Sequence, residues 1–167
     1  ALPPSPTVPV PDGGGGWVCF VGAGPGIADL ITVRAARRLA QAEVVLADAL
    51  SDPALQALAP TALWLDVGKR GFHHATGQAR INALLLEHAT AGRRVVRLKG
   101  GDPSLFGRLE EELQALGAVG IPCEVVPGVT AAVAAAADVQ RPLTRRGQGR
   151  SVAFTTAMSQ TGELVAR

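Results

Sequence analysis

Residues that could do chemistry cluster just after five short apolar runs of this sequence. Each run ends in glycine, proline, aspartate or lysine, and the runs are WVCFVG, EVVLAD, ALWLDVG, RRVVRLKG and IPCEVVPG. Continuous apolar runs are typical of parallel strands buried on both faces. In such sheets, ligands bind beyond the carboxyl ends of the strands. We therefore expect one site, built from the segments that follow these five strands.

The segment after the first run, GAGPG at 22–26, predicts a tight turn rather than a phosphate-binding loop. Gly22 and Gly24 match the start of the dinucleotide fingerprint G-x-G-x-x-G, but Ile27 stands where the third glycine is needed. Pro25 has no N–H to donate to a pyrophosphate. Such a turn lets an uncharged part of a ligand approach the backbone. A plain strand-to-helix turn is the alternative interpretation.

Charged groups follow the second and third runs. Asp48 could accept a proton, hold a ribose hydroxyl, or only cap a helix or a loop. After the third run come Lys69, Arg70, His73 and His74, which suit an acidic substrate or a proton donor, with a solvated basic loop as the alternative. Because adjacent histidines rarely chelate one ion and no Cys or Glu partner lies at ligand spacing, we expect no metal.

The fourth run ends at Gly100 and leads into the segment GGDP at 100–103. Gly100 and Gly101 are expected to expose backbone, Asp102 offers a carboxylate and Pro103 fixes the turn. Bare backbone beside one acid suits a ligand that donates hydrogen bonds from amino or hydroxyl groups. It does not suit a phosphate.

Helices are expected between the strands, because apolar residues recur there at helical spacing and glycines follow. The predicted helices lie within 28–42, 52–59, 77–92, 109–120 and 129–139, with Asp29 in the cap region of the first. Alternating strands and helices predict an α/β fold with a parallel sheet and helices on both faces. A sixth strand, SVAFTT at 151–156, follows a polar stretch.

The chain divides into four expected parts. They are a flexible Pro/Gly-rich leader over 1–16, an N-terminal α/β domain over 17–140, a linker over 141–150, and the first strand of a second, truncated α/β domain over 151–167. The leader lacks the features of a secretory signal, and no apolar run approaches the length of a membrane span. We expect a cytoplasmic protein with no membrane partner, in which Cys19 and Cys123 stay reduced.

The overall composition argues against nucleic-acid binding. The net charge is +2, whereas polyanion-binding proteins usually show a larger basic excess. Aromatic residues make up 4% of the chain, which leaves few side chains on which bases could stack. A small-molecule substrate is therefore expected.

Several long motifs together resemble one enzyme family. In order, they are VGAGPG, VGKRGFHH, QARIN, VVRLKGGDPSLFGR, GIPCEVVPGVTAA and PLTRRG. From about Trp17 to Thr156 the chain resembles the tetrapyrrole methylases, and among them the uroporphyrinogen-III C-methyltransferases. The resemblance implies S-adenosylmethionine as methyl donor, S-adenosylhomocysteine as its product, and conversion of uroporphyrinogen III to precorrin-2 for sirohaem and cobalamin. It also implies two α/β domains and a homodimer.

The resemblance assigns roles to particular residues. Asp48 matches the proton acceptor proposed for the family, and Lys69 matches its proposed proton donor. The cofactor would lie along Pro25, Gly100, Gly101, Asp102, Leu105, Thr130 and Ala131. Substrate carboxylates could pair with Arg70, Arg97, Arg108, Arg145 and Arg146.

Departures from the family keep other functions open. Residues that differ from those usual in the family include Ile27, Ala47, Ala49, Ser104, Leu109, Glu110, Gln140, Arg141 and Arg145. The family's second domain should begin near Ser151, so we expect the isolated chain to bind S-adenosylmethionine poorly. The alternatives are a non-catalytic binding or dimerisation module and a methylase of another precorrin. A nicotinamide-binding domain is disfavoured by Pro25 and the misplaced third glycine.

Overall fold

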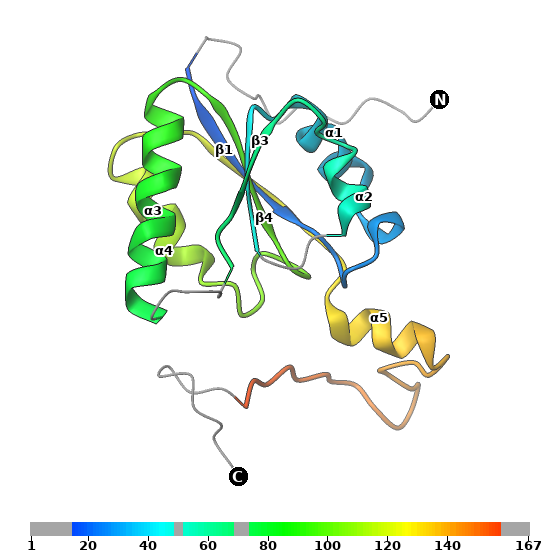
Figure 1. The fold of residues 1–167 in the computed structure, drawn as a ribbon. Coiled ribbons are helices and arrows are strands. Elements are labelled where there is room, and N and C mark those ends of the chain that lie inside the picture. Colours follow the sequence, from blue (N-terminus) through cyan, green and yellow to red (C-terminus); the bar gives the residue numbers. More distant parts are fainter. Residues whose placement is uncertain (1–14, 49–51, 69–73, 158–167) are drawn as a thin grey trace.

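A five-stranded parallel sheet forms the centre of the molecule, in a computed structural model that describes residues 15–48, 52–68 and 74–157 (Figure 1). The strand order is β3-β2-β4-β1-β5. The strands are β1 (Trp17–Gly22), β2 (Val44–Ala47), β3 (Leu63–Asp66), β4 (Arg94–Lys99) and β5 (Cys123–Val126). The parallel α/β architecture predicted from the sequence is confirmed.

Helices cover both faces of the sheet, which explains why its strands are apolar on both sides. Figure 1 shows α1 (Val33–Gln41) and α2 (Pro53–Gln56) on one face, with α3 (His74–Thr90) and α4 (Leu109–Gly117) on the other. Two apolar clusters fill the layers: Cys19, Val21 and Val96 belong to the first, and Phe20 and Leu85 to the second. Every residue of β1 is buried between them.

The remaining helix, α5 (Ala131–Asp138), lies beyond the carboxyl edge of the sheet (Figure 1). The chain reaches it directly from β5. In the register of the sheet, Gly22 at the end of β1 pairs with Lys99 at the end of β4. The two central strands therefore end at the same level, and the segments after them start side by side.

The first helix begins later than the sequence predicted. Asp29 lies in a short 3-10 turn, Ala28–Leu30, whereas α1 begins at Val33 and is capped by Thr32. The Thr32 hydroxyl accepts a hydrogen bond from the Ala35 N–H at 3.1 Å. Thr32 rather than Asp29 sits one residue before the helix in extended backbone, which is the geometry that an N-cap needs.

The strand predicted over 151–156 is wrong. Residues 151–157 form no strand and are exposed. A strand needs a neighbour to bond its backbone N–H and C=O groups, and the described sheet includes only β1 to β5. Before this segment, a turn is closed by hydrogen bonds between Arg145 and Gly149. The proposed domain boundary near Ser151 stays a prediction.

Within the described part of the chain, no helix combines the length and apolarity needed to cross a membrane.

Candidate active site at the carboxyl edge of the sheet

Three neighbouring segments, here named the carboxyl-edge loops, follow the strands β1, β4 and β5. They comprise residues 22–26, 100–105 and 127–131. The loops after β1 and β4 are joined by an antiparallel bridge between Gly24 and Gly101. The Gly101 N–H donates to the Gly24 carbonyl at 2.8 Å, and the Gly24 N–H donates to the Gly101 carbonyl at 3.2 Å. Gly24 and Gly101 both have positive φ, which glycine adopts without strain.

The loop after β5 packs on the other two through bare backbone. A Cβ on Gly22 would lie 2.6 Å from the Gly128 Cα, and a Cβ on Gly128 would lie 2.2 Å from the Gly101 oxygen. Both distances are far shorter than any van der Waals contact. Glycine at 22 and 128 is therefore required by the close approach of the three loops.

Asp102 joins the same loops through its carboxylate. Its Oδ1 accepts the Ser104 N–H at 2.8 Å, and its Oδ2 accepts the Gly128 N–H at 2.9 Å. The carboxylate that the sequence offered to a ligand thus already holds two backbone amides. Each oxygen keeps one further lone pair, so Asp102 can still accept from a ligand.

Gly100 differs from its neighbours because none of the described residues explains why it is glycine. It is exposed, its φ is not positive, and a Cβ placed there would meet no atom of the described residues within 4 Å. The sequence predicted that Gly100 and Gly101 both expose backbone. Gly100 does, but the N–H and C=O of Gly101 are occupied by Gly24.

Donors are available at the start of α5. Thr130 is the N-cap residue, yet its hydroxyl makes no capping hydrogen bond. The first N–H groups of any α-helix also lack partners inside the helix. Thr130 and Ala131 therefore offer polar groups beside Gly101, since a Cβ on Gly101 would lie 3.7 Å from the Thr130 Cα.

All seven residues predicted to contact a cofactor thus lie on the carboxyl-edge loops. Pro25 is half-buried between Gly24 and Gly26, and the Leu105 N–H closes a turn on the Asp102 carbonyl at 3.2 Å. The structure brings these segments together, while the role of each residue stays a prediction.

Asp48 lies at the same edge, beyond β2, which neighbours β4. Its side chain is 47% exposed, and its Oδ1 lies 2.8 Å from the Arg97 Nη2. Arg97 therefore holds the Asp48 carboxylate, which is about half exposed. Lys69, its predicted partner in proton transfer, lies outside the described residues, as do Arg70 and His73.

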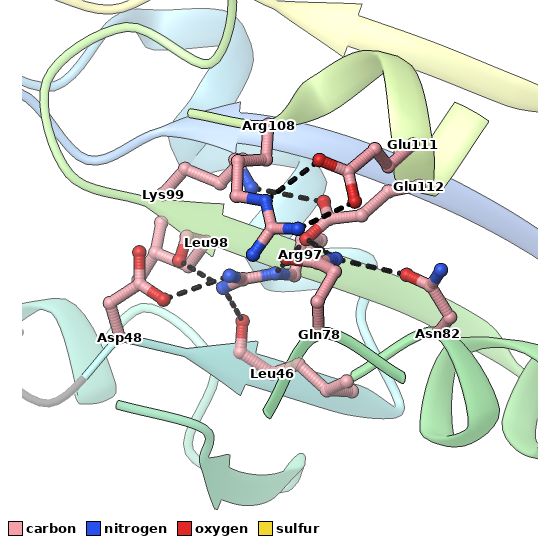
Figure 2. A network of polar contacts seen from close by, with 10 residues as sticks. All are labelled: Leu46, Asp48, Gln78, Asn82, Arg97, Leu98, Lys99, Arg108, Glu111 and Glu112. Atoms are coloured by element: carbon pink, nitrogen blue, oxygen red, sulfur yellow. Dashed lines mark hydrogen bonds and ion pairs between the residues drawn. The ribbon is translucent and has the colours of Figure 1, made fainter. Parts of the chain in front are cut away.

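Behind Asp48 lies a group that we name the buried charge cluster, drawn in Figure 2: Gln78, Arg97, Lys99 and Glu112. The Glu112 side chain is fully buried and contacts both cations, with Lys99 Nζ at 3.0 Å and Arg97 Nε at 3.4 Å. Gln78 on α3 donates to the same carboxylate at 3.2 Å. Burial, together with the charge of Arg97, lowers the pKa of Lys99, although Glu112 and Asp48 oppose this shift.

The position of Arg97 corrects one prediction. The sequence analysis offered Arg97 to substrate carboxylates, but its side chain is 3% exposed. Nη1 donates to the backbone carbonyls of Leu46 and Leu98, at 3.3 and 3.0 Å. Because the guanidinium is already surrounded by acceptors of the chain itself, Arg97 does not present its charge to solvent.

Sequence reasoning missed the buried charge cluster, although β4 carries a signal for it. Val95, Arg97 and Lys99 alternate along the strand and so share one face, where Val95 packs in the second apolar cluster. Charges on a face that is otherwise apolar need partners from the covering helices. The sequence does not say which acid supplies them, because α4 begins with Glu110, Glu111 and Glu112 in succession.

The other predicted arginines differ in exposure and partners. Arg108 forms an exposed ion pair with Glu111, with Nε 2.7 Å from Oε1. Arg145 and Arg146 are exposed in the turn before Ser151. These three remain available to a ligand from solution.

A second buried polar group lies across the sheet. Arg38 on α1 pairs with Glu124 on β5, and the Cys19 thiol donates to Glu124 at 3.6 Å. Burial, reinforced by the Glu124 charge, raises the pKa of Cys19 well above its ordinary value. Among the described residues, no three His, Cys, Asp or Glu side chains gather as a metal site would require.

Comparison with known proteins gives consistent matches. Residues 18–166 match the family Tetrapyrrole (Corrin/Porphyrin) Methylases. The chain is 51% identical over 154 residues to a siroheme synthase of Tolumonas auensis, covering 91% of this chain and 33% of the relative. It is 49% identical over 140 residues to a uroporphyrinogen-III C-methyltransferase of Cyanidium caldarium, covering 83% of this chain and 56% of the relative.

Solved structures agree with these matches. A uroporphyrin-III C-methyltransferase of Thermus thermophilus, complexed with S-adenosyl homocysteine, superposes with a TM-score of 0.76 at 45% identity, covering 89% of this chain and 63% of the other. The chain thus spans between a third and two thirds of the length of these relatives. From the family match and the shared fold, the chain belongs to the tetrapyrrole methylase family.

Proposed function

We propose that this chain forms the N-terminal α/β domain of a methyltransferase that uses S-adenosylmethionine to convert uroporphyrinogen III to precorrin-2. The observation that carries the proposal is the exposed Gly100, where the described part of the chain gives no reason for glycine. A ligand lying against the backbone would give that reason. The names of the relatives support the choice of ligand.

The carboxyl-edge loops fit a cofactor with amino-acid and ribose groups. Gly100 offers a carbonyl to amino or hydroxyl donors, and Asp102 offers its remaining lone pairs. The uncapped Thr130 hydroxyl and the N–H groups at the start of α5 suit a carboxylate. Pro25 and Leu105 add apolar contact. The 22–26 loop does not suit a pyrophosphate, because Pro25 has no N–H to donate.

S-adenosylmethionine, when bound, supplies a methyl group activated by its sulfonium. The chain's own contribution is to hold the reactants in line and to move protons. Asp48 can accept a proton at its exposed carboxylate, and Lys69 can donate one. Arg108, Arg145 and Arg146 can pair with the substrate's carboxylates.

The organisation of the whole protein is also a proposal. Residues 17–140 would form the first domain, 141–150 a linker, and 151 onward the start of a second domain that completes the cofactor site. The longer relatives support this division. A homodimer in the cytoplasm fits the family, and analytical ultracentrifugation tests the dimer.

A different methyl acceptor is the second candidate. A cobalt precorrin-4 methyltransferase superposes with a TM-score of 0.74 at 35% identity, covering 87% of this chain. The fold therefore serves more than one tetrapyrrole. A methylase of a later precorrin would transfer methyl to that substrate and leave uroporphyrinogen III unchanged.

The test is transfer of radiolabelled methyl from S-adenosylmethionine to uroporphyrinogen III, by the protein expressed from its complete natural reading frame. We expect Asp48→Asn to lower kcat by about 10²- to 10⁴-fold, as loss of an acid–base group does. The matched control is Asp66→Asn at the end of β3, whose Oδ1 only accepts the Gly68 N–H. Unchanged activity in Asp48→Asn removes Asp48 from catalysis. Absence of transfer by the wild type refutes the function.

A further inference from the structure

Arg97 connects the buried charge cluster to Asp48. Arg97 contacts Glu112 with Nε, the Leu46 and Leu98 carbonyls with Nη1, and Asp48 with Nη2 (Figure 2). Because a guanidinium is planar and its donors are fixed in one fork, the first three contacts determine where Nη2 points. The orientation of the Asp48 contact is therefore set from inside the protein.

Within the buried charge cluster, the orientation of Arg97 depends on Glu112. It is fully buried, and it is the carboxylate that contacts both Arg97 and Lys99. Without it, buried Lys99 would lose its carboxylate and Arg97 would keep only the half-exposed Asp48, at a large desolvation cost. With Asp48 included, two cations meet two carboxylates, so the whole group is neutral.

The cluster also connects the elements that surround the edge of the sheet. Glu112 lies on α4 and Gln78 on α3, while Arg97 and Lys99 lie on β4. Gln78 donates to Glu112 and to Asn82, at 3.2 and 3.0 Å. The cluster thus links α3, α4 and β4 to Asp48, the half-exposed acid that follows β2.

We propose that Glu112 is a positioning residue, which holds Arg97 so that Arg97 fixes the Asp48 carboxylate for proton transfer. This rests on the proposed role of Asp48 in methyl transfer. Glu112 does not touch a substrate, since its side chain is fully buried. Its effect on the reaction passes through Arg97 and Asp48.

A double-mutant cycle on the protein from its complete natural reading frame tests this inference. The four proteins are the wild type, Glu112→Gln, Asp48→Asn and the double variant. We expect Glu112→Gln to lower kcat by about 10- to 100-fold, as misplacement of a reacting group does, with both KM values unchanged. In the Asp48→Asn background, the same substitution should leave kcat unchanged. Equal fold-losses in both backgrounds overturn the positioning role and leave Glu112 purely structural.

Urea unfolding of the same four proteins provides a readout that does not need activity. Because Glu112 and Asp48 share one guanidinium, the midpoint shifts of the single variants should not sum to that of the double variant. Additive shifts overturn the inference whatever the activity. A wild type that transfers no methyl refutes the proposed function, while non-additive shifts in that protein still support the linkage.

Two further variants keep the experiment decisive. Glu110→Gln is the control on the same helix, because Glu110 is exposed and only accepts from Gln114 at 3.3 Å. It should change neither kcat nor the coupling. If Glu112→Gln does not fold, Arg97→Lys replaces it in the cycle. A lysine ammonium keeps the positive charge, but it cannot reproduce the planar set of donors by which the guanidinium contacts Glu112 and Asp48 together. The same outcomes then support or overturn the inference.

Discussion

Polar side chains at the carboxyl edge of the sheet are bonded to other groups of the protein, even where the sequence suggests that they face solvent. Asp102 appears in the sequence as a free acid, yet it accepts two backbone amides. Arg97 appears as a surface cation, yet it is buried among acceptors. Residue type alone predicted where polar groups gather, but not whether each side chain is already occupied. That distinction depends on distances between segments far apart in the chain.

A buried thiol makes the stability of this protein sensitive to alkali. Burial raises the pKa of Cys19 above its ordinary value of 9.0, so the folded protein keeps a proton that the unfolded chain releases. This contribution is complete below pH 9 and declines as pH rises further. From about pH 8 to about pH 10, the wild type should lose more unfolding free energy than Cys19→Ala, with a slope of at most about 1.4 kcal/mol per pH unit.

Urea unfolding at several pH values measures this difference between the two proteins. Cys123→Ala serves as the control, because Cys123 is exposed. Its pKa is raised by partial burial alone, without a neighbouring carboxylate. Its pH profile should follow that of the wild type more closely. Parallel profiles for the wild type and Cys19→Ala would contradict the prediction.

At the scale of elements, local sequence patterns predicted the strands and helices that local interactions determine. Each described strand and α-helix overlaps a segment predicted from apolar spacing, glycine stops or Pro53, although α1 begins later and α3 begins earlier, at His74, than predicted. Segment 151–156 has the same apolar character, but pairing of a strand requires a neighbour that its own sequence does not encode. The Asp29 prediction failed by three residues, because several polar residues near a helix start are equally able to cap it.

The N-cap of α1 gives an element-scale prediction. Thr32→Ala removes the hydroxyl that accepts the Ala35 N–H, and should lower the free energy of unfolding by about 1 kcal/mol. Thr32→Ser keeps the acceptor and should lie within a few tenths of the wild type. Urea unfolding monitored by circular dichroism compares the three proteins. Equal loss in the alanine and serine variants would show that the threonine methyl, rather than the cap, is responsible.

At the scale of the whole molecule, apolar side chains remain exposed near the carboxyl-edge loops. The carboxyl-edge loops are complete in themselves, but α5 and the segment after it keep large apolar side chains in solvent: Val133, Val139, Leu143, Val152 and Phe154. The match covers 56% of the Cyanidium caldarium relative and 63% of the Thermus thermophilus structure. Neither the sequence pattern nor the fold of one domain specifies the contacts that further residues would add.

Isothermal titration calorimetry tests whether the isolated chain holds the proposed cofactor. We expect residues 1–167 alone to bind S-adenosylmethionine weakly, because contacts from a second domain would be missing and each lost charged or polar contact costs about 1 to 3 kcal/mol. The Thermus thermophilus relative, titrated in parallel, provides the positive control. Tight, stoichiometric binding by the isolated chain would show that one domain suffices.

The contact among Gly22, Gly101 and Gly128 also determines where this protein can be redesigned. Adding one methyl group at position 22 or 128 would force three loops apart, so these positions are closed to variation. Position 100 is open, because a Cβ there meets no atom of residues 15–48, 52–68 and 74–157 within 4 Å. A library that seeks altered cofactors should therefore hold the three contact glycines constant and vary residue 100, where an added side chain can change ligand shape selection without disturbing the scaffold.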